Sequence, residues 1–103
     1  MGYKLLITPS ALDELSEIVD YISNNLDNPF SAADFLDKVG ECYDRLKDNP
    51  KIYQLCDYPE FKEKNYRKAI IKNYVLIYRI DETTQTVNLL HFFFGRQNYF
   101  SIL

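Results

Sequence analysis

The side chains best able to do chemistry in this sequence are cations in its second half. Arg96 ends the last of three apolar segments, and Tyr99 follows it. Six further cations lie just before or within the first two of these segments: Lys62, Lys64, Arg67, Lys68, Lys72 and Arg79. The stretch from Asp13 to Asp48 instead holds ten acidic residues against three basic ones. This split indicates an anionic partner for the basic part of the chain, although charge placed only for solubility would give the same pattern.

The sequence has few residues that could support metal-dependent or nucleophilic catalysis. The sequence has no metal-ligand cluster, phosphate-binding loop, nucleophile elbow or paired-carboxylate motif, so we expect neither a metal nor a cofactor. The single histidine, His91, is expected to be a sheet residue bonded to a neighbour rather than a catalyst. Cys42 and Cys56 are not spaced as metal ligands, and we expect two buried free thiols in a reducing cytoplasm. A disulfide between them is the alternative.

Three segments rich in β-branched and aromatic residues must position the cations. They cover residues 66–72, 73–81 and 86–96, and short polar breaks separate them, which predicts an antiparallel meander of three strands. Alternation along the first strand places Lys68 on one face and Arg67 on the other. In the last strand it places Asn88, Leu90, Phe92 and Phe94 opposite Val87, Leu89, His91 and Phe93.

Two amphipathic helices precede the meander. Thr8-Pro9 and Asn28-Pro29 each combine a capping residue with a proline at the first helical position, and Asn49-Pro50 predicts the end of the second helix. The expected buried stripe of the first helix is Leu12, Leu15, Val19, Ile22 and Leu26. That of the second is Phe30, Ala33, Leu36, Val39, Tyr43 and Leu46, with Phe35 and Cys42 at its margin. Gly40 inside this helix indicates either a close approach to a neighbour or a tolerated cost.

These elements predict one domain over residues 1–103, because a chain of 103 residues supplies a single core. Residues 3–7 form a first strand, and residues 51–65 form a loop with one helical turn near residues 60–64. The predicted fold is a two-layer α+β domain of order β-α-α-β-β-β, with the helical hairpin on one face of the sheet and the other face open. No apolar run reaches the length of a membrane span, so we expect a cytoplasmic protein.

The order of the elements and several phrases resemble the RelE/ParE superfamily of bacterial toxins. The phrases are Thr8-Pro9-Ser10-Ala11, Tyr66-Arg67-Lys68, Asn73-Tyr74-Val75-Leu76-Ile77-Tyr78-Arg79-Ile80-Asp81-Glu82, Thr86-Val87 and Gly95-Arg96-Gln97-Asn98-Tyr99. The resemblance covers essentially the whole chain. It implies the growth-arresting toxin of a type II toxin–antitoxin (addiction, plasmid stabilisation) module. A cognate antitoxin would neutralise the toxin by wrapping it with a helix or strand, and the pair would bind operator DNA through the antitoxin.

The resemblance implies two possible targets. RelE-like members are metal-independent endoribonucleases that cut mRNA on the ribosome, whereas ParE-like members inhibit DNA gyrase. Where RelE-like nucleases carry an arginine this sequence has Val75, and where several relatives have His or Tyr it has Phe94. Because neither side chain can bind phosphate or donate a proton, we favour the ParE-like mode slightly. The alternatives are the RelE-like mRNA interferase and a degenerate, non-toxic module that only binds antitoxin.

The site residues follow from the same resemblance. If the chain is a nuclease, the catalytic set would be Arg67, Lys68, Arg96 and Tyr99. Contacts to target or antitoxin would come from Lys72, Arg79, Arg96, Tyr99 and Phe100. The competing interpretation is that Arg67, Lys68 and Arg96 pair with antitoxin carboxylates or with Glu63, Asp81 and Glu82.

Overall fold

A computed structural model describes residues 2–25 and 29–95 of the chain. The elements follow the order β1 (Lys4–Ile7), α1 (Pro9–Asn25), α2 (Pro29–Asp48), the 3-10 turn η1 (Pro50–Ile52), α3 (Pro59–Glu63), β2 (Tyr66–Ile71), β3 (Tyr74–Asp81) and β4 (Thr86–Phe94). The predicted α+β order is therefore confirmed, and α3 is the expected helical turn. None of the helices in the described ranges is long and apolar enough to cross a membrane.

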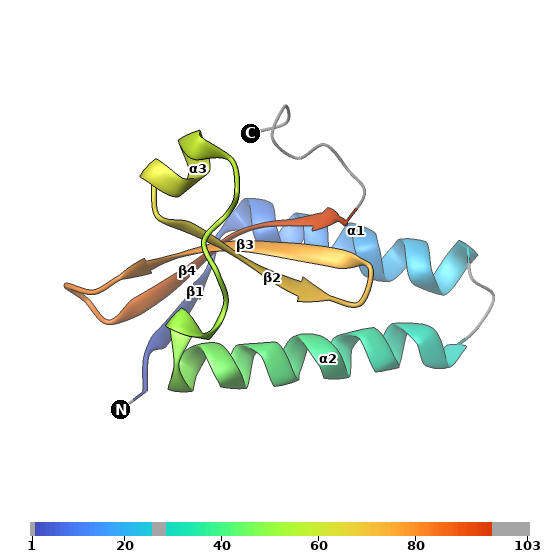
Figure 1. Ribbon diagram of the computed structural model, residues 1–103. Helices are drawn as coiled ribbons and strands as arrows, with labels where there is room; N and C mark the ends of the chain where they lie inside the picture. The colour runs from blue at the N-terminus through green and yellow to red at the C-terminus, as the bar shows by residue number, and fades with distance from the viewer. Residues whose placement is uncertain (1, 26–28, 96–103) are drawn as a thin grey trace.

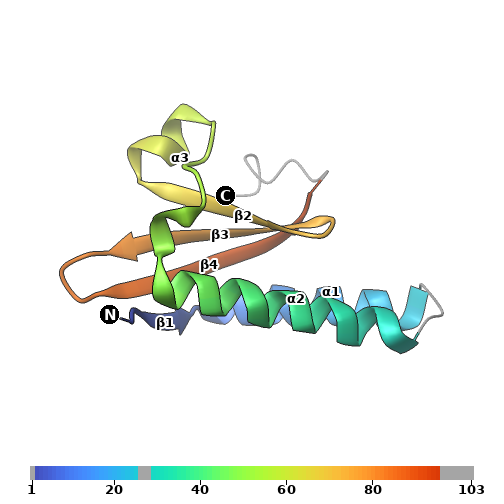
Figure 2. The ribbon, with the colours of Figure 1, turned by 60° about the horizontal axis from the view of Figure 1, so that its bottom comes forward.

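The sheet has four strands in the order β1-β4-β3-β2. β2, β3 and β4 form the antiparallel meander, and β1 pairs with β4 in parallel at one edge. The helices α1 and α2 run along one face of this sheet, and α3 lies on the opposite side (Figures 1 and 2). We call these the hairpin face and the α3 face.

Thr8 fixes the turn from β1 into α1. Its hydroxyl oxygen accepts a hydrogen bond from the Ala11 N–H at 3.2 Å, as expected of a helix cap. The same hydroxyl lies 2.9 Å from the carbonyl oxygen of Leu89, to which the Thr8 N–H also donates. One residue therefore begins the helix and ties it to the neighbouring strand.

The main core lies between the helices and the hairpin face of the sheet. Its largest fully buried side chains include Tyr78, Phe35, Phe92, Leu46, Leu76 and Leu89. The Tyr78 hydroxyl donates to the Pro50 carbonyl oxygen at 2.7 Å, so the polar end of this buried ring is satisfied.

The predicted helix stripes are confirmed in part. Ile22, Val39 and Leu46 are buried, and Leu15, Val19 and Tyr43 pack against the main core, whereas other predicted members are exposed. Leu26 lies outside the described residues. On α1 the buried residues are Ala11, Ile18 and Ile22, while Leu12 is 53% exposed.

On α2 the buried stripe is Phe35, Val39, Cys42 and Leu46. Phe35 and Cys42, which were expected at the margin, are therefore members of the buried stripe. Phe30 is 78% exposed and Leu36 is also exposed. The apolar residues of α2 form two overlapping stripes, each with helical spacing. The stripe that includes Phe35 is the buried one, and the centroid of the Phe35 ring lies 4.9 Å from that of the Tyr74 ring.

A β-bulge overturns part of the predicted alternation in β4. Ile77 pairs with His91 and Tyr78 pairs with Leu89, which leaves Leu90 as the extra residue. Val87, Leu89 and Phe92 consequently all reach the main core, although strict alternation places Phe92 on the other face. A bulge adds one residue to a strand and so reverses the faces beyond it.

The α3 face is not fully open, contrary to the expectation. Five buried residues form a second cluster on it: Cys56, Phe61, Val75, Ile77 and Phe93. Cys56 precedes α3 and Phe61 lies within it, so the segment between η1 and β2 covers this part of the sheet. The central strands β3 and β4 are therefore buried from both sides.

Gly40 and Gly95 differ in whether there is room for a side chain at their positions. A Cβ added at Gly40 would meet no atom within 4 Å, so no close approach requires this glycine. A Cβ added at Gly95 would lie 2.9 Å from the carbonyl oxygen of Asn73, which accepts the Gly95 N–H at 2.6 Å. Gly95 is thus required for contact between the end of β4 and the β2–β3 turn.

Replacing Gly40 by alanine should stabilise the protein by about 1 kcal/mol, because alanine removes backbone entropy from the unfolded chain without a clash. For a domain of this size the expected rise in Tm is about 4–8 °C. Gly95→Ala is the matched comparison and should lower Tm. Thermal unfolding followed by circular dichroism measures both. A Gly40→Ala variant no more stable than the parent would contradict the open surroundings of this residue.

Both cysteines are buried free thiols, as expected, and they belong to clusters on opposite sides of the sheet. Burial raises the pKa of the Cys42 thiol and of the Cys56 thiol above the ordinary value. The thiolate is the reactive form, and burial also blocks access to it. Neither side chain is therefore prepared for nucleophilic chemistry.

Native protein should react with Ellman's reagent at pH 8 at least about tenfold more slowly than free cysteine, because each thiol needs local opening to react. In guanidinium chloride both thiols should react at once. A native thiol that titrates as fast as free cysteine would show that its cluster is not closed.

Candidate target-binding surface

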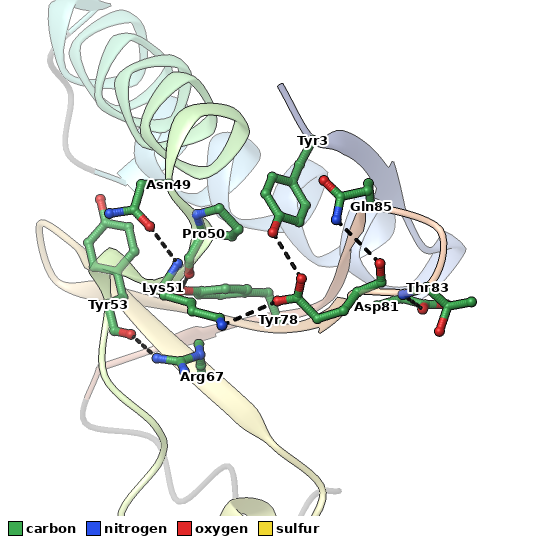
Figure 3. A network of polar contacts seen from close by, with 11 residues as sticks. Tyr3, Asn49, Pro50, Lys51, Tyr53, Arg67, Tyr78, Asp81, Thr83 and Gln85 are labelled. Carbon is green, nitrogen blue, oxygen red and sulfur yellow. Dashed lines mark hydrogen bonds and ion pairs between the residues drawn. The ribbon is translucent and has the colours of Figure 1, made fainter. Parts of the chain in front are cut away.

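Arg67 lies on the hairpin face of β2, opposite Tyr78 in the neighbouring strand. Its guanidinium donates to the carbonyl oxygen of Tyr53 at 2.6 Å (Figure 3). The side chain is half-buried, and the bond joins β2 to the residue that follows η1. Arg67 therefore has a structural role. Its hydrogen-bond partner is Tyr53, and not Glu63, Asp81 or Glu82 as one interpretation of the sequence expected.

Lys68 lies on the α3 face, opposite Ile77. Its ammonium is 3.0 Å from a carboxylate oxygen of Asp57, and the Lys68 side chain is only 16% exposed. Arg67 and Lys68 are adjacent in sequence but point to opposite sides of the sheet, as alternation predicts. They do not converge on one phosphate-sized site.

The other predicted cations are dispersed as well. Lys72 sits in the β2–β3 turn with a φ of 55°, and its ammonium forms an ion pair with Asp34 of α2. The hydrogen bond from Lys72 holds the pKa of the Asp34 carboxyl below its ordinary value. Arg79 is exposed on β3, with Tyr66 and Asn88 as its neighbours across the sheet.

Three predicted site residues fall outside the described residues. They are Arg96, Tyr99 and Phe100. The point at which the chain leaves the sheet is nevertheless defined, because Gly95 binds the Asn73 carbonyl beside the β2–β3 turn. Phe94, just before it, packs against the rings of Tyr21 at 5.5 Å and Tyr74 at 5.3 Å.

Val75, the position at which the resemblance to RelE-like nucleases implies an arginine, lies on the α3 face of β3. The side chain is 5% exposed and belongs to the second cluster, together with Cys56, Phe61 and Phe93. An apolar side chain closed in by apolar neighbours offers no donor to a phosphate. The surface above it is formed by α3 and the segment that precedes it.

His91 is bonded to a neighbour, as expected, but the neighbour is one that the sequence does not suggest. Its Nδ1 lies 3.0 Å from one carboxylate oxygen of Glu14 on α1, and the same oxygen accepts the Phe92 N–H at 3.2 Å. β1 pairs with β4 only up to Leu89, so Glu14 occupies the edge of β4 beyond that point. This pair closes a sheet edge and gives no indication of catalysis.

The described residues contain no group of three or more His, Cys, Asp or Glu side chains placed to hold a metal ion. What remains as a candidate binding surface is the outer edge of the sheet around β2, with Arg79 exposed on the neighbouring strand. Such a surface can bind an anionic macromolecule, but residues 2–25 and 29–95 do not assemble an acid, a base and cations in one place on it.

One family model and several solved structures match this chain. A family model described as the ParE toxin of the type II toxin–antitoxin system parDE matches residues 5–99. Among solved structures, the toxin–antitoxin complex RelBE2 from Mycobacterium tuberculosis matches with a TM-score of 0.65 at 20% identity, over 91% of this chain and 99% of that chain. A chromosomal ParDE system from P. aeruginosa matches with a TM-score of 0.66 at 16% identity, over 90% and 96%.

No curated protein matches the sequence. The two structural matches establish the fold and score almost equally, so they do not separate RelE-like from ParE-like proteins. The family match covers nearly the whole chain, including every described strand but the first residue of β1. The chain belongs to the ParE toxin family and is the toxin component of a type II toxin–antitoxin system.

Proposed function

We propose that this toxin arrests growth by binding DNA gyrase and that it does not cleave RNA. The observation that supports this most is the environment of Val75, which is 5% exposed beneath Cys56 and Phe61. A nuclease needs a cation there to neutralise the charge that develops on the scissile phosphate. Here the position belongs to an apolar cluster.

The arrangement of the cations supports the same proposal. RNA cleavage by this superfamily needs a base for the 2′-hydroxyl, an acid for the leaving oxygen and cations between them. Arg67 is bonded to Tyr53 on one face of β2, and Lys68 is paired with Asp57 on the other. Moving Arg67 away would leave the part-buried carbonyl oxygen of Tyr53 without this hydrogen bond.

The RelE-like alternative depends on the closing residues Arg96 and Tyr99, which the sequence retains. In that mode they would act on ribosome-bound mRNA together with Arg67 or Lys68. A degenerate module that only binds antitoxin is the third possibility. It differs from both because expression of the chain alone would leave growth unchanged.

The partner we propose is a cognate antitoxin encoded beside this gene. The two similar structures named above are of toxin–antitoxin systems. The antitoxin would neutralise the toxin in the cytoplasm, and the pair would bind its operator DNA through the antitoxin. Charge supports an anionic contact, since residues outside 13–48 carry nine basic and five acidic side chains.

Purified toxin, released from its antitoxin and refolded, should inhibit supercoiling of relaxed plasmid by gyrase in proportion to its concentration. Addition of the antitoxin should restore supercoiling, because the antitoxin competes for the toxin. Agarose gels of the plasmid topoisomers measure both effects. Undiminished supercoiling at a large excess of folded toxin would contradict gyrase as the target.

Arg79→Ala should reduce toxicity while leaving the fold intact, because Arg79 is exposed and lies on the surface rather than in either core. A lost hydrogen bond from a cation to a charged partner costs about 1.5–3 kcal/mol, which corresponds to a loss of potency of roughly 10–100-fold. The matched control is Lys47→Ala at the exposed end of α2, which should keep full potency. Colony counts across an inducer series measure the difference, and equal potency of the two variants would remove Arg79 from the binding surface.

A further inference from the structure

β1 forms the edge of the sheet opposite to β2, and its outer side has no partner strand among the described residues (Figure 2). The N–H groups of Lys4 and Thr8 both donate toward β4, to carbonyl oxygens in or next to that strand. Because successive residues of a strand point alternately to its two sides, the N–H and carbonyl groups of Leu5 and Ile7 point away from β4. No backbone hydrogen bond between elements in the described part of the chain uses these outward groups.

The side chains along this edge are apolar. Leu5 packs against the main core, whereas Leu6 is 56% exposed and Ile7 is 37% exposed. Alternation places Leu6 on the α3 face, but it is not a member of the second cluster that α3 covers. An unpaired edge with exposed apolar side chains at its centre is a template for pairing with another strand.

Few features of β1 protect it from such pairing. Natural sheet edges carry lysines, prolines, bulges or inward-pointing charges for this purpose. The only charged residue of β1 is Lys4 at its first position, and Pro9 comes after the strand has ended. What remains is the length of the strand, which is four residues. A strand too short to pair is therefore the competing explanation for the free edge.

A second copy of β1 fits this edge in an antiparallel arrangement. The outward groups of Leu5 in one copy meet those of Ile7 in the other, and a two-fold axis relates the two pairs. Leu6 then lies opposite Leu6 of the other copy, and Lys4 lies opposite Thr8. Every pair joins two apolar residues or a lysine with a threonine, so no like charges meet.

The neighbouring two-fold registers are poorer. Pairing Leu5 with its own counterpart would set Ile7 opposite Tyr3, whose N–H already donates to the Lys47 carbonyl oxygen at 2.8 Å. Pairing Ile7 with its own counterpart would set Leu5 opposite Pro9, which has no N–H to donate. The register centred on Leu6 therefore uses all the outward groups of both copies.

We propose that two copies of this toxin associate through antiparallel pairing of their β1 strands. The pairing joins two four-stranded sheets into one continuous sheet, with β2 at each outer end. It does not depend on which macromolecule the toxin acts on. A strand of four residues buries little surface, so the dimer is weak and its population rises with concentration.

The dimer would present its two α3 faces on the same side, because the two-fold axis is perpendicular to the joined sheet. Leu6 pairs with Asn88, which pairs with Arg79 in the next strand. At about 4.8 Å per strand, the backbones of the two exposed Arg79 residues would lie about 24 Å apart. A partner that contacts both copies binds more tightly than one that contacts a single copy.

Sedimentation of the refolded toxin tests the association. Its apparent mass should rise from 12.2 kDa toward twice that value as the concentration increases about a hundredfold. Leu6→Glu should abolish the rise, because it places two carboxylates opposite one another on the two-fold axis. Leu36→Glu, at an exposed leucine of α2, is the matched control and should associate like the parent. A parent mass that stays at 12.2 kDa over the whole range would overturn the proposal, and so would equal association of the two variants.

Disulfide cross-linking tests the register and detects even a weak dimer. In a non-hydrogen-bonded antiparallel pair, opposed Cα atoms lie about 4.5 Å apart, within the range that a disulfide spans. Leu6→Cys should therefore form a covalent dimer under mild oxidation. Lys4→Cys is the matched control, because this position faces Thr8 of the other copy and lies about 13 Å along the strand from its own counterpart.

Non-reducing gels measure the covalent dimer, and the native Cys42 and Cys56 are buried. Leu6→Cys should cross-link at least about tenfold faster than Lys4→Cys, because paired strands hold its two thiols together. Equal rates for the two variants would indicate random collisions and would contradict the proposed register.

Hydrogen exchange of the unmodified toxin identifies the occupant of the edge. The amides of Leu5 and Ile7 should exchange at least about tenfold more slowly at high protein concentration than at low concentration, because pairing protects them. If these amides slow only when the antitoxin is added, the edge belongs to a different partner and the proposal fails. It fails equally if nothing slows them, since the strand is then simply too short to pair.

Discussion

Burial of β3 and β4 from both sides is the constraint on which the rest of this structure depends. The hairpin of α1 and α2 covers one face, where Leu76, Tyr78 and Leu89 are fully buried. On the other face of the sheet, α3 and the residues just before it cover Val75 and Ile77. A domain of about 100 residues has little stability to lose, so both layers of packing matter. Of the described cations in the meander, Arg67 and Lys68 lie on the outer strand β2 and Lys72 lies in the β2–β3 turn, whereas Arg79 is exposed on β3.

This distribution explains why Arg67 and Lys68 do not lie together in one site. Arg67 and Lys68 belong to the outer strand β2, where alternation sends them to opposite faces, and each has a partner within the chain. On the α3 face, Phe61 and Cys56 pack with Val75 in an apolar cluster.

Much of the fold could be predicted from the sequence because local signals were strong. The polar breaks at residues 72–73 and 82–85 separate the three strands where the structure does, and Thr8-Pro9 and Asn49-Pro50 mark helix ends. What could not be predicted depends on contacts between distant residues. The extra residue Leu90 changes the faces of β4, and a bulge leaves no mark in a continuous run of apolar side chains. Phe35 rather than Phe30 faces the sheet, although both satisfy a helical period.

The candidate site was predictable only in part, for the same reason. Sequence identifies the cations but not their partners, because Tyr53, Asp57 and Asp34 lie in other segments. Glu14 looks like an ordinary surface residue of α1, yet it binds the ring of His91 and the backbone of Phe92, nearly 80 residues away. Cys56 and Phe61 are two of several apolar residues in the segment between η1 and β2, and these residues were the available sign that this segment packs against the sheet.

The central claim is that closure of the α3 face over Val75 leaves this toxin unable to cut RNA. The most direct measurement uses 5′-labelled mRNA bound to purified ribosomes with an open A site, incubated with refolded toxin that inhibits gyrase. The account predicts intact mRNA at toxin concentrations that abolish supercoiling. Discrete cleavage products in the A-site codon, absent when the antitoxin is added, would contradict it.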